Sequence, residues 1–180
     1  MLNEKVICAG FGGQGVMSMG QLLTYAGMIE DKQVSWLPSY GPEMRGGTAN
    51  CNVMVSESLI GSPIIDGDAT CAIVMNLPSL VKFEADLVPQ GKLLINSSLI
   101  DDKASRDDVQ AYYIPANEAA LELGNSKVAN MVMLGAYIEL TKAVSFDALH
   151  KALEKVFGGR KAHLIDVNVK ALEKGASLVK

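Results

Sequence analysis

The opening of the chain constrains its fold most strongly, because an apolar strand there runs straight into a glycine cluster and then into a helix. We expect the strand over 5–9 and the helix over 13–29, and Gly10, Gly12 and Gly15 have the spacing of a phosphate-binding loop. Glycines allow a tight turn and let backbone N–H groups approach an anion at the positive end of the helix dipole. A turn that only packs internally would have the same spacing, so this motif alone leaves the ligand open.

The bulk properties predict one domain over residues 1–180, since a chain of this length buries roughly 70% of its unfolded surface. The sequence has no apolar run of about 18 residues, so we expect no membrane span. The first residues lack the design of a signal peptide, which favours a cytoplasmic location. The net charge is −4 and the Lys and Arg residues are scattered, which argues against nucleic acid as a partner.

Strand and helix patterns alternate along the chain, which predicts an α/β protein. Residues 71–75 are apolar throughout, as is typical of a strand buried on both faces of a parallel sheet. Pro38 is expected to end the second strand, and residues 60–66 to form a short strand or hairpin return. Further strands are expected over 34–37, 48–55, 92–96 and 112–115, and further helices over 78–85, 116–123, 128–141 (amphipathic), 146–157 and 164–174. We therefore predict a Rossmann-like three-layer fold with a mostly parallel sheet.

Residues 53–81 carry only three charged side chains, Glu57, Asp66 and Asp68. A sheet with one solvated face would not need so uncharged a stretch. The segment is either the buried centre of the sheet or, in part, a contact with another subunit.

A nicotinamide-binding fold places an acidic residue at the end of its second strand to hold the ribose hydroxyls. No carboxylate stands at the end of the run 34–40, and Glu30 and Asp31 precede it. This absence makes NAD a minor alternative. Two alternatives remain for the glycine loop (residues 10–15): a phosphate of another ligand at Gly12, Gly13, Gln14 and Gly15, or an internal packing turn.

The loop over 38–47 should lie at the carboxyl edge of the sheet beside the glycine loop, where such folds bind ligands. Arg45 stands before Gly46 and Gly47, and its planar guanidinium suits a phosphate or a carboxylate. An anion, a neighbouring subunit or an ion pair with Glu43 are the alternatives for Arg45. Tyr40 can pack against a ligand ring or within the protein.

No catalytic or metal-binding constellation is evident in the sequence. The three cysteines lie far apart in apolar runs, and we expect buried structural roles for them. His150 and His163 have no motif-spaced nucleophile or carboxylate, so we expect surface or capping roles.

Three segments together resemble one family. The run Gly10-Phe-Gly-Gly-Gln-Gly15, the run 38–47 (Pro-Ser-Tyr-Gly-Pro-Glu-Met-Arg-Gly-Gly) and Gly61-Ser-Pro63 are similar to the gamma subunit of 2-oxoacid:ferredoxin oxidoreductases. The likeness covers nearly the whole chain. The form of the second segment is closer to the 2-oxoglutarate and branched-chain 2-oxoacid enzymes than to the pyruvate enzymes.

The resemblance implies a subunit of an enzyme of anaerobic metabolism that decarboxylates a 2-oxoacid on thiamine diphosphate, forms an acyl-CoA and reduces ferredoxin. Alpha and beta subunits, with or without a delta subunit, would hold the thiamine diphosphate and the iron–sulfur clusters. This chain would be inactive alone, bind no metal and supply no catalytic residue. It would help to assemble the complex and shape the coenzyme A region. The candidate binding residues are Gly10, Gly12, Gly13, Gln14, Gly15, Tyr40, Arg45, Gly46 and Gly47.

Three rival hypotheses remain open at this point. The beta subunit of indolepyruvate oxidoreductase has the same type of domain, and an aryl substrate would distinguish it. A free-standing NAD(P)-dependent dehydrogenase would bind nicotinamide tightly as an isolated chain. A stand-alone coenzyme A or nucleotide-binding module would be a stable monomer without partners.

Overall fold

The computed structural model describes residues 1–40 and 48–180. The strands in these residues are β1 (Asn3–Phe11), β2 (Gln33–Tyr40), β3 (Thr48–Ser56), β4 (Ala69–Val74), β5 (Leu87–Asn96) and β6 (Gln110–Ile114). The α-helices are α1 (Val16–Ile29), α2 (Leu77–Phe83), α3 (Ala116–Glu122), α4 (Ala129–Thr141), α5 (Phe146–Phe157) and α6 (Ile165–Ser177). Short 3-10 helices follow α2, precede α4 and precede α6: η1 (Glu84–Asp86), η2 (Ser126–Val128) and η3 (Gly159–Leu164).

The strands form one sheet in the order β2-β3-β1-β4-β5-β6. Strands β1, β4, β5 and β6 pair in parallel with one another, whereas β3 pairs antiparallel with both β1 and β2. Strand β2 therefore runs in the same direction as β1, although β3 lies between them. The sheet is mostly parallel, which confirms the predicted fold class.

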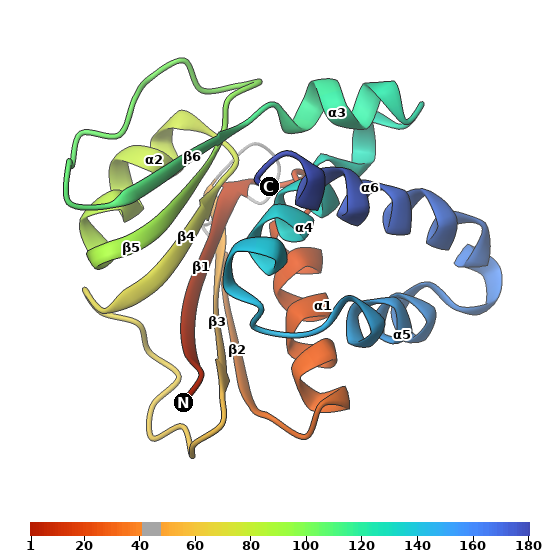
Figure 1. The fold of residues 1–180 in the computed structure, drawn as a ribbon, viewed down its shortest axis with the longest axis horizontal. Helices are drawn as coiled ribbons and strands as arrows, with labels where there is room; N and C mark the ends of the chain where they lie inside the picture. Colours follow the sequence, from red (N-terminus) through yellow and green to blue (C-terminus); the bar gives the residue numbers. More distant parts are fainter. Residues whose placement is uncertain (41–47) are drawn as a thin grey trace.

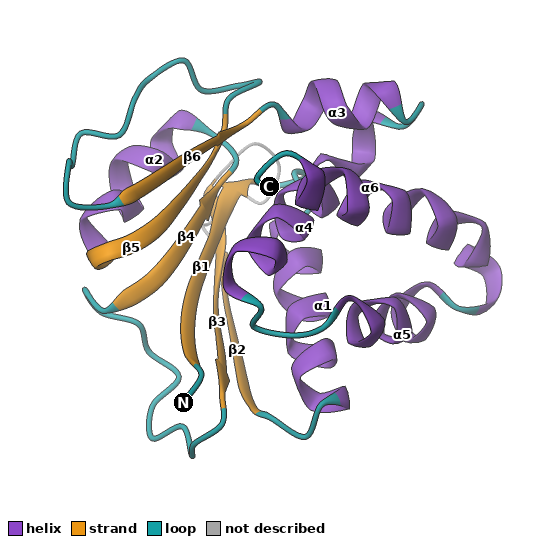
Figure 2. Cartoon of the chain, viewed as in Figure 1, coloured by secondary structure: helices purple, strands orange, loops and turns teal. Residues whose placement is uncertain are grey.

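Helices lie on both faces of this sheet and give the molecule three layers (Figures 1 and 2). Helix α2 packs on one face against β1 and β4, and α1, α4, α5 and α6 form a thicker layer on the other. Successive strand side chains point to opposite faces. In β1, Val6 and Cys8 face the thicker layer, whereas Ile7 and Ala9 face α2.

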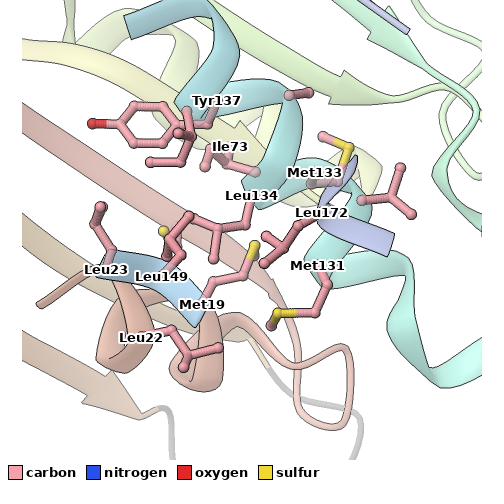
Figure 3. Packing of buried hydrophobic residues seen from close by; sticks show 14 of the residues in the cluster. Met19, Leu22, Leu23, Ile73, Met131, Met133, Leu134, Tyr137, Leu149 and Leu172 are labelled. Atoms are coloured by element: carbon pink, nitrogen blue, oxygen red, sulfur yellow. The ribbon is translucent and has the colours of Figure 1, made fainter. Parts of the chain in front are cut away.

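The larger core lies between the sheet and the thicker helical layer (Figure 3). Helix α4 is buried on all sides over its first ten residues, including Leu134 and Tyr137. The expected amphipathic character of this helix is wrong, because α6 covers the side of α4 that would otherwise face water. Leu172 of α6 belongs to the same core.

Some expected boundaries differ from the structure. Strand β2 continues through Pro38, because β2 is an edge strand and an edge tolerates a residue without an N–H donor. Residues 60–66 form no strand. Strand β5 starts at Leu87 and includes the Pro89-Gln-Gly91 run that was expected as a connection. Helix α5 begins as predicted, with Ser145 Oγ accepting a hydrogen bond from the N–H of Ala148 at 3.1 Å.

Residues 53–81 divide into two kinds of surroundings. The end of β3 and nearly all of β4 are buried in the sheet, and residues 71–75 are buried throughout, as predicted. The loop between these strands is largely exposed, with Leu59 88% and Ile64 61% accessible. Burial in the sheet therefore explains why the strands carry so few charges, but it does not explain this for the loop. A contact between the loop and another subunit stays a prediction. Within the described residues, no helix has both the length and the apolar character needed to cross a membrane.

Candidate functional site

The glycine loop leaves the carboxyl end of β1, at the edge of the sheet where β4, β5 and β6 also end. Gly10 pairs with Ala49 of β3, and Ala49 pairs on its other side with Tyr40 of β2. Thr48 pairs with Phe11. The described residues that flank 41–47 therefore reach the same edge as the glycine loop, because β3 pairs antiparallel with both β1 and β2.

Part of the predicted site lies outside the described residues. Arg45, Gly46 and Gly47 fall within 41–47, and only the backbone of Tyr40 is described. Their roles stay predictions from the sequence. The structure does describe the other five candidate residues: Gly10 lies near the end of β1, and Gly12, Gly13, Gln14 and Gly15 form the turn between β1 and α1.

The backbone of this turn is left-handed at two glycines. Gly13 has φ 98° and Gly15, the N-cap of α1, has φ 76°. The N–H of Gln14 donates to the carbonyl oxygen of Phe11 at 3.1 Å and closes the turn. Gly12 has no positive φ, so the conformational need for glycine falls on Gly13 and Gly15.

Gly10 and Gly15 are also required by close internal contacts. A Cβ on Gly10 would lie 2.7 Å from Gln14 Oε1 and 2.9 Å from Met75 Cβ. A Cβ on Gly15 would overlap the amide of Asn130, whose Nδ2 donates to the carbonyl oxygen of Gly15 at 3.1 Å. Internal packing of the turn therefore explains these two glycines. Gly13 differs, because a Cβ there would meet nothing within 4 Å.

The side chain of Gln14 makes its hydrogen bonds within the chain. Its Oε1 accepts from the N–H of Phe11 at 2.6 Å and from Asn76 Nδ2 at 3.3 Å, and its Nε2 donates to the carbonyl oxygen of Met75 at 3.1 Å. These contacts join the loop to the end of β4 and the start of α2. They give Gln14 a structural role, as an internal packing turn requires.

A hollow of about 210 Å³ opens beside the outer side of the turn. Its lining includes Gly13 and Gln14 before α1 and Ala129 and Asn130 at the start of α4, so the N-termini of two long helices meet there. Lys127 supplies a cation from η2, and none of the lining residues that the structure describes is a carboxylate. The remaining lining residues are Met75, Asn117 and Ser126.

A second hollow of about 220 Å³ adjoins the first and shares Lys127 and Asn130 with it. Apolar side chains dominate this part, including Met131, Phe157 and Leu164. The two hollows together form a groove with a polar end at the glycine loop and an apolar end near η3. The N-termini of two helices and one cation make the polar end suited to an anionic group.

Sequence reasoning missed four of the residues that shape this site: Asn76, Asn117, Lys127 and Asn130. Asn76 lies more than 60 residues from its partner Gln14, and Asn130 lies 115 residues from Gly15. Lys127 had one usable signal, since it stands in the short connection between two predicted helices. Nothing in the sequence pairs these residues with the glycine loop.

The cysteines lie apart from this groove, in the sheet. Cys8 faces Cys51 across β1 and β3, and a hydrogen bond with Cys51 together with burial raises the pKa of the Cys8 thiol. Burial likewise raises the pKa of the Cys71 thiol. All three are free and buried, as predicted. Over 1–40 and 48–180, no group of three or more His, Cys, Asp or Glu side chains is placed to hold a metal ion.

Comparisons with known proteins relate the chain to oxidoreductase subunits. A sequence model of the family described as pyruvate ferredoxin/flavodoxin oxidoreductase matches residues 5–178. The ketoisovalerate oxidoreductase subunit VorA of Methanothermobacter marburgensis is 39% identical over 96% of this chain and 36% of that protein. The 2-oxoglutarate synthase subunit KorC of Methanocaldococcus jannaschii is 33% identical over 99% of this chain and 95% of that protein.

The solved gamma subunit of a keto/oxoacid ferredoxin oxidoreductase from Geobacter sulfurreducens has a similar fold. It has a TM-score of 0.82 and 30% identity, with 98% of each chain covered. This chain spans about a third of the length of the VorA subunits that it matches, and nearly the full length of KorC. The region of similarity includes the glycine loop and the groove beside it.

Proposed function

This chain belongs to the pyruvate ferredoxin/flavodoxin oxidoreductase family as a gamma-type subunit of a 2-oxoacid:ferredoxin oxidoreductase, and we propose that its complex converts a 2-oxoacid and coenzyme A into acyl-CoA and carbon dioxide while reducing ferredoxin. A branched-chain 2-oxoacid or 2-oxoglutarate is the proposed substrate. The identities to relatives named for ketoisovalerate and for 2-oxoglutarate support this choice.

The proposed division of labour places the redox cofactors in partner chains. Thiamine diphosphate would supply the carbanion chemistry of decarboxylation, and iron–sulfur clusters would carry the electrons. The free cysteines described above are buried in the sheet and are not gathered as a cluster-binding set. We therefore assign both groups to alpha and beta subunits, with or without a delta subunit, and give this chain no catalytic residue. We propose that this chain, as a single domain, acts in the cytoplasm together with coenzyme A and ferredoxin.

The groove beside the glycine loop carries the proposal for this chain's own part. Coenzyme A presents a diphosphate and a 3′-phosphate, which need hydrogen-bond donors and positive charge. The backbone at Gly13, the starts of α1 and α4, and Lys127 offer these at the polar end of the groove. In the proposed complex, this end holds a phosphate of coenzyme A while partner subunits carry out the chemistry. Arg45 is the proposed second cation, on the strength of its motif alone.

The test starts with the complex purified anaerobically from its native cells through a tag on this chain. Viologen reduction is then assayed with 3-methyl-2-oxobutanoate, 2-oxoglutarate, pyruvate and indolepyruvate, with and without coenzyme A. Co-purified thiamine- and cluster-bearing subunits with coenzyme A-dependent activity on one of the first two substrates support the proposal. A preference for indolepyruvate or pyruvate contradicts the substrate, and a lone inactive chain contradicts the subunit role.

Replacement of Lys127 tests the contribution of the groove. A charge-assisted hydrogen bond contributes about 1.5–3 kcal/mol, so Lys127→Ala should raise the KM for coenzyme A roughly tenfold or more, with the KM for the 2-oxoacid unchanged. Lys161→Ala removes an exposed cation of η3 outside the lining and is the matched control. Equal KM values for coenzyme A in Lys127→Ala and Lys161→Ala would show that the groove is not part of the coenzyme A site. Arg45→Ala should raise the same KM or weaken assembly.

A further inference from the structure

The glycine loop is held from its inner side by a pair of amide side chains, Gln14 and Asn76. Gln14 accepts the N–H of Phe11 and donates to the carbonyl oxygen of Met75, so one side chain joins the end of β1 to the end of β4. Gly10 leaves the space that this side chain fills. The loop therefore has a fixed shape before any ligand arrives.

The side-chain amide of Asn76 makes two hydrogen bonds, and each has a different role. Its Oδ1 accepts the N–H of Ser79 at 2.9 Å and caps the start of α2, and its Nδ2 donates to Gln14 Oε1 at 3.3 Å. The side chain is 4% exposed and lies below the loop. A cap needs only an acceptor, and Ser, Thr or Asp would provide it. The donor to Gln14 is the property that asparagine adds.

The outer side of the loop is free of such contacts. Gly13 is exposed and has φ 98°, and a Cβ at this position would meet nothing within 4 Å. It lines the polar end of the groove beside Lys127. The two sides of the loop thus differ: the inner side is fixed by Gln14 and Asn76, and the outer side presents backbone to the groove.

We propose that Gln14 and Asn76 are positioning residues that hold the glycine loop in its anion-binding shape, and that ligand contact belongs to the backbone around Gly13. This inference rests on the proposed function for the identity of the ligand. Without the Asn76 donor, the glycine loop adopts its anion-binding shape only part of the time. The apparent affinity for the anionic ligand falls in proportion to that fraction. One hydrogen bond of ordinary strength corresponds to an affinity change of about 3- to 10-fold.

The variant Asn76→Asp separates the two tasks of this residue. The new carboxylate still accepts the N–H of Ser79 at a helix start, where a negative charge is favourable. It offers no donor to Gln14 Oε1 and repels that oxygen. In the assembled complex we expect a melting temperature within a few degrees of the wild type, faster hydrogen exchange in the peptide that contains Phe11, and a coenzyme A KM raised about 3- to 10-fold with kcat unchanged.

The pH dependence gives a readout that a merely structural role would not produce. Protonation of the introduced carboxyl restores an O–H donor toward Gln14 Oε1, so the ratio of variant to wild-type KM should fall as the pH is lowered. Asn76→Ser is the matched control, because a hydroxyl caps the helix but does not titrate. Its KM ratio should be raised and independent of pH.

Unchanged exchange around Phe11 in Asn76→Asp would overturn the inference, whatever the kinetics. Faster exchange with an unchanged coenzyme A KM would overturn it too, since the loop would then be loosened without consequence for binding. Failure of the proposed function is distinguishable, because the wild-type complex would then lack coenzyme A-dependent activity before any variant is compared. In that case the exchange experiment still decides whether Asn76 holds the loop.

Discussion

A side chain in the glycine loop can destabilise the fold by backbone strain or by overlap with a neighbouring residue, and Gly13 and Gly15 distinguish these two effects. Both have positive φ, but only at Gly15 would a Cβ overlap a neighbour, the amide of Asn130. Gly13→Ala should therefore cost only the left-handed strain, about 1–2 kcal/mol of unfolding free energy, and Gly15→Ala should cost clearly more. Urea unfolding of the purified chain measures both values.

The control for these two variants is Gly61→Ala, at a glycine with open space and no positive φ, and we expect it to be close to neutral. Equal losses at Gly13 and Gly15 would mean that Asn130 moves aside at no cost. That result would contradict the close contact between α4 and the loop.

The same residues show how far the sequence could predict the site. The spacing of Gly10, Gly12 and Gly15 located the loop, because the strand, turn and helix that define it are local. The spacing did not reveal which glycines pack inward, since that depends on Met75, Asn76 and Asn130, which only the folded sheet brings to the loop. The sequence leaves Gln14 open between a ligand phosphate and an internal packing turn, because its partners Met75 and Asn76 are distant in the chain.

At the scale of the elements, the crossing of α4 and α6 depends on two glycines. A Cβ on Gly135 of α4 would overlap the backbone of Leu172, and a Cβ on Gly175 of α6 would overlap the backbone of Val132. Backbone cannot move aside as a flexible side chain can, so the two helices would have to separate and lose core contacts.

We expect Gly175→Ala to lower the free energy of unfolding by about 1–3 kcal/mol, although alanine is the better helix former by about 1 kcal/mol. Thermal and urea denaturation monitored by circular dichroism measure the change, with Gly61→Ala again as control. A stabilised variant would show that helix propensity outweighs the crossing, and that α4 and α6 are not in close contact in solution.

Element boundaries were predictable where the cause was local and were missed where it was tertiary. The N-cap Ser145 and the apolar run of β4 are local signals, and both elements lie where they were expected. Pro38 was expected to end a strand, but its place at the sheet edge lets β2 continue. Helix α4 was expected to have a polar face, but α6 buries that face, which no window of α4 alone can reveal.

At the scale of the whole molecule, charged side chains join segments that are distant in the chain. Asp68 of the loop before β4 pairs with Lys5 of β1, and this hydrogen bond lowers the pKa of the Asp68 carboxyl. Glu30 at the end of α1 pairs with Lys32 at 2.7 Å and accepts the N–H of Ser145, the cap of α5, at 2.7 Å. Burial acts to raise the pKa of Glu30, but the hydrogen bonds from Lys32 and Ser145 outweigh it and lower this pKa.

The sign of the resulting pH dependence follows from these lowered pKa values. A carboxyl whose pKa is lower in the folded state contributes stability that is fully present above its unfolded pKa, about 4.3 for Glu, and is lost as the pH falls through the folded value. The free energy of unfolding should therefore decline from pH 6 to pH 3.

Glu30→Gln should be less stable than the wild type at pH 6 and should lose less stability on acidification. Urea unfolding of the isolated chain at both pH values measures the two slopes, with Asp101→Asn, an exposed carboxylate on the connection before β6, as control. Parallel pH profiles for Glu30→Gln and the wild type would contradict the role of Glu30, and would leave the α1–α5 junction to be held by core packing rather than by charge.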